Sequence, residues 1–214
     1  MIKIAGTTRQ TFSFPADIAT ASNFYRDFSR ILHYLPHIYV VKAYSPDQFR
    51  VMYHTMELGM YRVRIYCDLH VKYDEASETL HVAPLLNKPP IKSEATVHSL
   101  TAQGHFTSQS IFRARSDHSM IDYQLSLEAR LPKPFGLTLM PDKAIEQIAR
   151  NITDWRIHEI ARGFVKRSVL EYREQATAAV NEGALVRSAR QEWCPAVVAP
   201  QSHHVRSNTQ PGER

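Results

Sequence analysis

The feature that most limits how this chain can fold is a long helical pattern near its end, from Pro141 to about Gln175. Proline suits the first turn of a helix, where its missing N–H would be unpaired anyway, and Asp142 complements the positive end of the helix dipole. Apolar residues then recur at helical spacing: Ile145, Ile148, Ile152, Trp155, Ile160, Phe164 and Val165. A helix of this length needs a large apolar partner. We therefore expect it to lie across a curved sheet, with Trp155 buried between them.

The residues before this helix alternate as half-buried strands do. The cleanest alternation runs from Tyr61 to Tyr73, where every second residue is apolar and most intervening residues are charged. Strands are predicted on the same grounds at 2–14, 38–43, 49–54, around 80–82, 106–115 and 121–131. One apolar face and one charged face predict an antiparallel sheet whose outer side is solvated and whose inner side packs on the helix.

Two short helices are predicted between the first two strands. Pro15 ends the first strand, Asp17 stands where a helix would begin, and Pro36 closes the pair. The order of strand, two short helices, strand meander and long helix predicts an α+β helix-grip fold, in which a curved antiparallel sheet wraps around the long C-terminal helix. Residues 84–95 contain too many prolines for a strand and are predicted to form a loop. Because such a loop lacks ladder hydrogen bonds, it is a candidate gate.

The segment from Phe12 to Ile38, FSFPADIATASNFYRDFSRILHYLPHI, resembles the opening of the START-like (SRPBCC) superfamily, which includes polyketide cyclases and pollen-allergen-type ligand carriers. In both, a strand ends at a proline, a helix carries aromatic residues toward its end, an aspartate follows, and an aromatic-x-Pro segment leads into the second strand. The resemblance covers about residues 1–176 and is closest to uncharacterised single-domain members. It implies a helix-grip fold with an internal cavity, and it carries over no catalytic residue.

The last part of the chain differs in composition from the rest. Residues 1–176 are predicted to form the ligand-binding domain. Residues 177–214 contain three prolines and many Ser, Asn and Gln residues, so they are predicted to form a partly disordered tail. The first part of this tail, up to about Gln191, can continue the long helix as a frayed extension. A solvated tail is the favoured interpretation. The alternative is a transient contact with a membrane surface or a partner, made by Arg187, Arg190, Trp193 and Val197.

Composition and motifs exclude several classes of function. The net charge of +5 permits contact with anionic lipid or nucleic acid, but no nucleic-acid-binding motif accompanies it. No apolar run is long enough to span a bilayer and no signal-peptide pattern opens the chain, so a cytoplasmic location is expected. Cys67 and Cys194 are far apart, which argues against a disulfide, and Cys67 on an apolar strand face reads as an inert core thiol.

No catalytic, metal or cofactor site is predicted from motifs. His33 and His37 are four residues apart, but Pro36 breaks the helix that would place them on one face. Neither a G-x-S-x-G nucleophile elbow nor a glycine-rich phosphate loop is found among the seven glycines.

The inner face of the sheet and the helix suggest a binding cavity. Ser110 lies between inward-facing Phe106 and Phe112, and a small hydroxyl among aromatic side chains leaves room for a ligand. The alternatives are that the serines face solvent or that a bulge near Gly104 shifts the register. The candidate lining residues are Tyr61, Ile65, Phe106, Ser110, Phe112, Tyr123, Leu125, Ile148, Ile152 and Trp155.

Three functions remain open. The favoured one is binding or transport of a hydrophobic small molecule, such as a lipid, a quinone, an isoprenoid or a polyketide-like aromatic. The alternative is a cyclase or dehydratase that uses the hydroxyls of Tyr61, Tyr123 and Ser110 as weak acids or orienting groups. The third is a structural or interaction protein whose own side chains fill the core. A buried histidine or carboxylate in the cavity would favour the enzyme, and a dry aromatic lining would favour the carrier.

Overall fold

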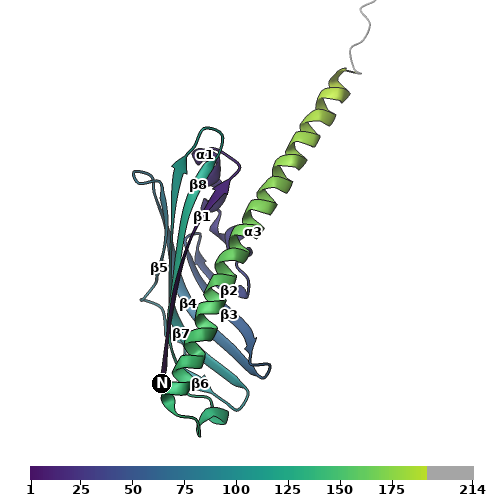
Figure 1. Cartoon of the computed structure of the whole chain (residues 1–214). Coiled ribbons are helices and arrows are strands. Elements are labelled where there is room, and N and C mark those ends of the chain that lie inside the picture. Colours follow the sequence, from purple (N-terminus) through teal and green to yellow (C-terminus); the bar gives the residue numbers. More distant parts are fainter. Residues whose placement is uncertain (192–214) are drawn as a thin grey trace, which may run out of the picture. The chain divides into compact units, whose positions relative to one another are not determined.

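The computed structural model describes residues 1–191 (Figure 1). The chain divides into two compact units, Met1–Glu174 and Gln175–Arg214. All of the strands found in residues 1–191 belong to the first unit. The second unit begins with helical residues that continue as far as Gln191. Trp193 and Val197, which the sequence suggested for a membrane or partner contact, lie outside the described residues.

One sheet of eight strands forms the body of the first unit. Its order is β1-β8-β7-β5-β4-β3-β2, and β6 pairs with β7 off this path. The strands are β1 (Ile2–Phe14), β2 (Ile38–Ser45), β3 (Gln48–Glu57), β4 (Tyr61–Asp74), β5 (Thr79–Pro84), β6 (Glu94–Ala95), β7 (Ser99–Ala114) and β8 (Ser119–Leu131).

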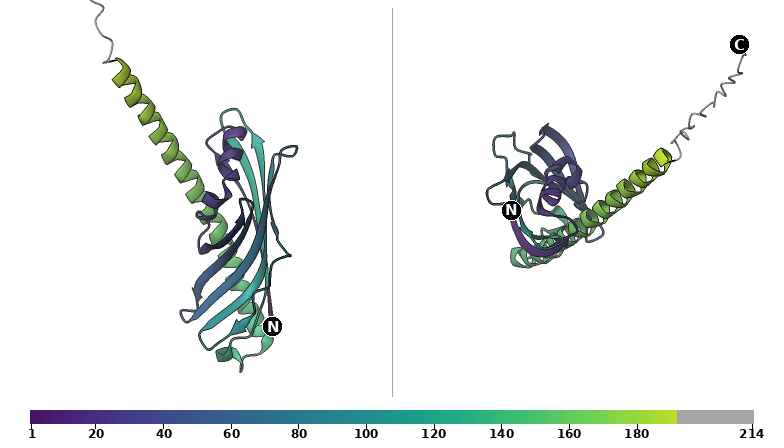
Figure 2. Two further views of the ribbon diagram at one scale, coloured as in Figure 1. Left: turned by 180° about the vertical axis from the view of Figure 1, so that it is seen from behind. Right: turned by 90° about the horizontal axis from the view of Figure 1, so that it is seen from above.

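Neighbouring strands are antiparallel with one local exception. β7 begins earlier than the sequence pattern predicted, at Ser99, and its first residues pair in parallel with β4. Its later residues pair antiparallel with β5 and β8. The sheet curves around the part of the long helix that belongs to this unit (Figure 2). The predicted α+β helix-grip fold is confirmed.

Two aspartates begin the short helices that follow β1. Asp17 accepts a hydrogen bond from the Thr20 backbone N–H at 2.8 Å at the start of α1 (Ile18–Arg26). Asp27 accepts one from the Arg30 backbone N–H at 3.3 Å at the start of α2 (Phe28–Leu32). Each carboxylate satisfies a backbone donor that the helix itself leaves unpaired, which fixes where each helix starts.

The long helix α3 (Asp142–Gln191) follows a short 3-10 turn, η1 (Phe135–Leu137). Its buried residues within the first unit are Ile145, Thr153, Ile157, Ile160, Ala161, Phe164 and Ser168. Several of them are small, so the helix approaches the sheet closely: a Cβ on Gly6 of β1 would lie 3.1 Å from the Thr153 Cγ2 atom.

The prediction that Trp155 is buried is wrong, because its side chain is 58% exposed. The buried face of the helix follows Thr153, Ile157 and Ile160, whereas a step of about 100° per residue places Trp155 on the opposite side. The indole ring instead lies against the guanidinium carbon of Arg156, 4.2 Å from the ring centroid.

Aromatic side chains fill the half of the core beside α1. Phe14 packs against Phe24 and Tyr25 with ring centroids 5.4 Å and 5.3 Å away. The Tyr25 hydroxyl makes a buried hydrogen bond with the Ser168 hydroxyl at 2.9 Å. Because α1 contributes these large rings, this half of the core is occupied by protein.

Of residues 84–95, which were predicted to form a loop, 85–93 do so, whereas Pro84 ends β5 and Glu94 and Ala95 form β6. The loop is held on the outer face of the sheet. The Arg50 guanidinium donates to the Pro89 carbonyl at 2.7 Å, and the Ile91 N–H donates to Gln103 at 2.9 Å. Arg50 also makes an ion pair at 2.8 Å with the buried carboxylate of Asp68. The loop therefore lies away from the inner face.

Candidate functional site: an apolar cavity between sheet and helix

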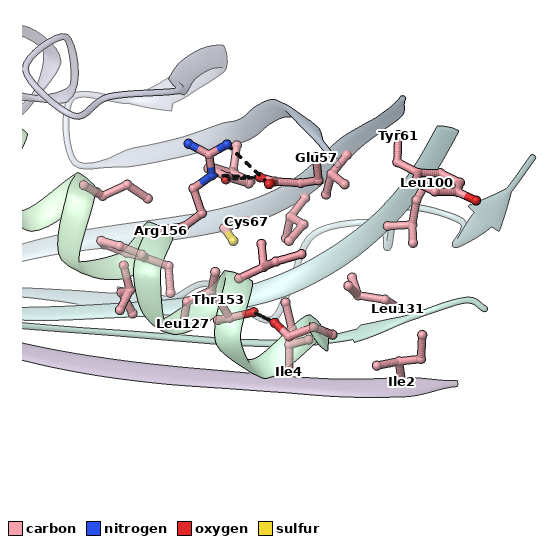
Figure 3. A pocket seen from close by; sticks show the side chains of 18 of the residues that line it. Ile2, Ile4, Glu57, Tyr61, Cys67, Leu100, Leu127, Leu131, Thr153 and Arg156 are labelled. Carbon is pink, nitrogen blue, oxygen red and sulfur yellow. Dashed lines mark hydrogen bonds and ion pairs between the residues drawn. The ribbon is translucent and has the colours of Figure 1, made fainter. Parts of the chain in front are cut away.

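A cavity of about 140 Å³ lies between the inner face of the sheet and α3, in the half of the core that the aromatic side chains do not fill (Figure 3). Most of its wall is aliphatic. The apolar lining side chains come from six strands, from α2 and the connection after it, from the β3–β4 turn, from the segment before α3 and from α3 itself. They include Ile2, Ile4, Leu32, Leu35, Val51, Leu58, Val63, Ile65, Leu69, Leu100, Phe106, Leu125, Leu127, Leu131, Leu137, Ile145, Ile148, Ile152 and Ile157.

The strand alternation explains why these side chains meet. On β4, Tyr61, Val63, Ile65, Cys67 and Leu69 occupy every second position and all face the cavity. On α3 the lining residues recur at intervals of three and four, which is the spacing of one helical face. The cavity thus follows directly from two periodicities that face each other.

Six of the ten predicted site residues line this cavity: Tyr61, Ile65, Phe106, Leu125, Ile148 and Ile152. The other four do not. Trp155 is exposed, as described above, while Ser110, Phe112 and Tyr123 are buried in the neighbouring aromatic half of the core.

The three buried residues face inward but meet protein instead of empty space. Tyr123 packs on Phe164 with ring centroids 4.9 Å apart, and Phe112 packs on Tyr25 at 5.9 Å. Ser110 is inward-facing and buried, so the alternative that it faces solvent is wrong. Its cross-strand partner is Tyr123, in the part of the core that α1 covers.

A charged pair forms one edge of the cavity. The Arg156 Nε atom of α3 donates to Glu57 Oε1 at 2.8 Å, and Arg156 Nη2 donates to Glu57 Oε2 at 3.3 Å (Figure 3). The two side chains are only 15% and 12% exposed, and both line the cavity. Glu57 is the last residue of β3, so the pair joins the sheet to the helix.

Further polar groups surround this pair. The Tyr53 hydroxyl donates to Glu57 Oε1 at 3.1 Å, and Arg156 Nη1 donates to Glu159 at 2.6 Å. Glu159 is in turn 3.4 Å from the His37 ring nitrogen Nε2. Burial of Tyr53, together with the nearby charge of Glu57, raises the pKa of the phenol well above its usual value, so the hydroxyl remains a donor.

The arginine stays charged in this setting. Burial alone would lower the pKa of Arg156, but its hydrogen bonds to Glu57 and Glu159 outweigh burial and raise that pKa above its usual value. For Glu159, burial would raise the pKa, yet the hydrogen bonds to Arg156 and His37 leave that pKa lowered. The network is therefore held together by one permanent cation between carboxylates.

Sequence reasoning missed both Glu57 and Arg156. Glu57 stands next to the β3–β4 reversal and Arg156 next to Trp155, so both resemble ordinary surface charges. The position of Arg156 in the helical pattern could have revealed that it faces inward. It lies one turn after Ile152 and one turn before Ile160, both of which face the cavity.

The segment between β8 and α3 closes the cavity near Tyr61. Pro134 and Leu137 belong to its lining, and a Cβ on Gly136 would lie 2.4 Å from the Tyr61 hydroxyl oxygen. None of residues 84–95 lines the cavity. The cavity lining therefore gives no support to this loop as the gate, whereas Pro134 and Leu137 do belong to that lining.

Cys67 lines the cavity as a buried thiol. Burial raises the pKa of this thiol to about 12, with a further contribution from the charge of Asp68, so the nucleophilic thiolate is not formed near neutral pH.

Within the described part of the chain, no three His, Cys, Asp or Glu residues are grouped so that they could hold a metal ion.

Comparisons with known proteins show the fold. No family model matches the chain, and neither does any curated protein. Among solved structures, the Zhui aromatase/cyclase from Streptomyces sp. R1128 is 11% identical, matches over 82% of this chain and 98% of its own, and has a TM-score of 0.50. A START superfamily protein from Mycobacterium smegmatis is 14% identical over 79% of this chain and 98% of its own, with a TM-score of 0.42.

The chain thus has the START-like (SRPBCC) fold that the segment from Phe12 to Ile38 implied. At these identities the comparison concerns the fold alone.

Proposed function

We propose that this protein binds a hydrophobic small molecule, or a hydrophobic part of one, in the cavity between the sheet and α3. The observation that carries the proposal is the cavity itself, which is lined mainly by aliphatic side chains and occupies about 140 Å³. An engineered protein cavity of about 150 Å³ with a similar lining stays dry and binds benzene. The cavity therefore suits one ring or a short branched chain.

The size of the cavity ranks the candidate ligands. An isoprenoid unit, a quinone ring or one ring of a polyketide-like aromatic fits this space as it stands. A long lipid chain needs more room than this, because ligand sites that enclose whole drug-sized molecules usually measure about 300–1,000 Å³. Displacement of the segment from Pro134 to Leu137 would supply that room, since it covers the cavity with few side chains.

The enzyme alternative has one observation in its favour, the Glu57 carboxylate at the edge of the cavity. Of the three hydroxyls suggested as weak acids, only that of Tyr61 belongs to a lining residue. Both Glu57 oxygens are hydrogen-bonded to Arg156, which suits a positioning role better than that of a free base. We therefore keep binding as the proposed function and a cyclase or dehydratase as the second candidate.

The length and polarity of the helices bear on whether one of them could span a membrane. No helix in the part of the chain that the structure describes is long and apolar enough to cross a bilayer. A cytoplasmic location and a transient contact with a membrane surface remain proposals from the sequence.

Titration of the purified protein with toluene tests the proposal. Calorimetry is expected to show saturable binding of one toluene per chain. The variant Ala149→Phe places a ring in the cavity from α3 and is expected to abolish the binding, whereas Ala176→Phe, at an exposed position of the same helix, is expected to leave it unchanged. Absence of toluene binding to the unmodified protein would show that the cavity is not a ligand site.

A further inference from the structure

We propose that the ligand carries a hydroxyl group at one end and that this hydroxyl donates a hydrogen bond to Glu57 while its apolar body fills the cavity. The inference rests on the proposed function and adds the chemical class of the ligand. It starts from the contrast between an aliphatic wall and a single buried ion pair at its edge.

Glu57 has unused capacity as an acceptor. A carboxylate offers about four lone-pair positions, two on each oxygen. Oε1 accepts from the Tyr53 hydroxyl and from Arg156 Nε, and Oε2 accepts from Arg156 Nη2 within the described residues. One position on Oε2 is therefore available to an O–H donor in the cavity.

Arg156 has unused capacity as a donor. A guanidinium carries five N–H groups. In the described part of the chain three of them point to carboxylates, one at Nε, one at Nη1 and one at Nη2. A ligand hydroxyl that donates to Glu57 has lone pairs left over, and the neighbouring guanidinium can donate to them. The pair thus matches a group that both donates and accepts.

The charge of the network argues against an anionic ligand. Glu57 and Glu159 carry two negative charges and Arg156 one positive charge, with His37 3.4 Å from Glu159 at its outer side. A carboxylate entering the cavity would place a third negative charge beside two others, in a site where solvent screens charges weakly. A neutral hydroxyl meets no such repulsion.

The other polar side chains of the wall are already engaged or differently placed. The Thr153 hydroxyl donates to the Ala149 carbonyl of its own helix at 2.7 Å. The Tyr53 hydroxyl donates to Glu57, and the Tyr61 hydroxyl lies against the backbone at Gly136. The ion pair is therefore the place where a polar ligand group finds a charged acceptor.

Four toluenes that differ only in the para substituent test the inference on the unmodified protein: p-xylene and 4-methylphenol, which match in size, and the slightly larger 4-methylanisole and 4-methylbenzoate. We expect 4-methylphenol to bind about tenfold tighter than p-xylene, since a hydrogen bond to a charged group replaces a methyl contact. The anisole, which accepts but cannot donate, is expected to bind no tighter than p-xylene, and the benzoate more weakly than either.

The outcomes separate the two proposals. If p-xylene binds and 4-methylphenol binds no tighter, the hydroxyl inference is wrong while the proposed function stands. If 4-methylbenzoate binds tightest, the ion pair is an anion site and the inference is wrong. If none of the four binds, both proposals fail.

Two variants locate the effect at Glu57. Glu57→Gln is expected to reduce the preference for 4-methylphenol over p-xylene to less than about threefold, because the acceptor loses its charge. Glu159→Gln is the matched control, since Glu159 bonds the same guanidinium but does not line the cavity, and it is expected to keep the preference. A preference that survives Glu57→Gln would overturn the assignment. Should that variant not fold, the four ligands on the unmodified protein still decide.

Discussion

Gly163 of α3 packs directly against the ring of Pro36, the residue that closes the pair of short helices: a Cβ added at Gly163 would lie 2.4 Å from Pro36 Cγ. Alanine normally stabilises the interior of a helix by about 1 kcal/mol relative to glycine. Here the added methyl group meets a rigid ring, so the helix would have to move away from the α2–β2 connection.

We therefore predict that Gly163→Ala destabilises the protein, by about 1–3 kcal/mol as overpacked sites usually do. Urea unfolding measures the change. Arg162→Ala, at the exposed preceding position, is expected to change the stability by less than about 0.5 kcal/mol. Stabilisation by Gly163→Ala would show that helix and proline are not in contact.

Because only one side of α3 faces the core, alanine substitutions at two nearby positions of this helix are expected to differ in how much stability they remove. Ile157 is 2% exposed and Trp155 is 58% exposed. Ile157→Ala is expected to cost about 2–5 kcal/mol, because it empties a packed site. Trp155→Ala is expected to cost less than about 1 kcal/mol, the usual range of a stacking contact with an arginine. A larger loss at Trp155 than at Ile157 in thermal unfolding would reverse the assignment of the helix face.

Much of the fold could be predicted because its signals are local. Alternation from Tyr61 to Tyr73 fixes which side chains of β4 face inward, and Asp17 marks a helix start through a hydrogen bond three residues away. These patterns involve neighbours in the chain. They predicted the strand meander, the two short helices and the closing helix.

The site could be predicted only in part, because its extent depends on contacts between distant segments. Ile65 and Ile152 face inward by periodicity and do line the cavity. Whether an inward residue meets space or protein depends on α1, whose Tyr25 fills the region beside Phe112. Glu57 and Arg156 are 99 positions apart in the sequence, and no local pattern predicts that they pair.

Acid conditions are expected to weaken the network around Arg156. Hydrogen bonds to Arg156 and His37 leave the pKa of Glu159 below its ordinary value of 4.5, despite burial. A carboxylate with a lowered folded-state pKa contributes stability that is present above the unfolded pKa and lost as the pH falls through the folded one.

The stability difference between the unmodified protein and Glu159→Gln should therefore shrink as the pH is lowered below 4.5. Denaturant unfolding at a series of pH values measures this difference. Asp154→Asn, which removes an exposed carboxylate of the same helix, serves as the control for general charge effects. A difference that grows toward low pH would contradict the direction of the Glu159 pKa shift.

The unit Met1–Glu174 is predicted to fold without the rest of the chain. It contains every strand that the structure describes, and among the described side chains the last one packed on its core is Tyr172. A chain ending at Glu174 is expected to unfold cooperatively, with a midpoint within about 2 °C of the full chain, a shift that corresponds to less than 1 kcal/mol. Loss of the cooperative transition would show that later residues are required for folding.

The loop from Leu85 to Ser93 is expected to matter for stability and not for ligand entry. Its anchor Arg50 bonds both the Pro89 carbonyl and Asp68, whose side chain is 3% exposed. Arg50→Ala leaves that carboxylate without its cation and is expected to cost about 3–5 kcal/mol.

Because the loop does not line the cavity, Arg50→Ala is expected to leave the rates of toluene binding and release unchanged. Arg62→Ala, which removes an exposed arginine from the outer face of β4, is the control for loss of positive charge. Exchange of toluene can be followed by NMR under conditions where each variant is folded. Faster exchange in Arg50→Ala, with Arg62→Ala unchanged, would mean that loosening this loop opens a path to the cavity.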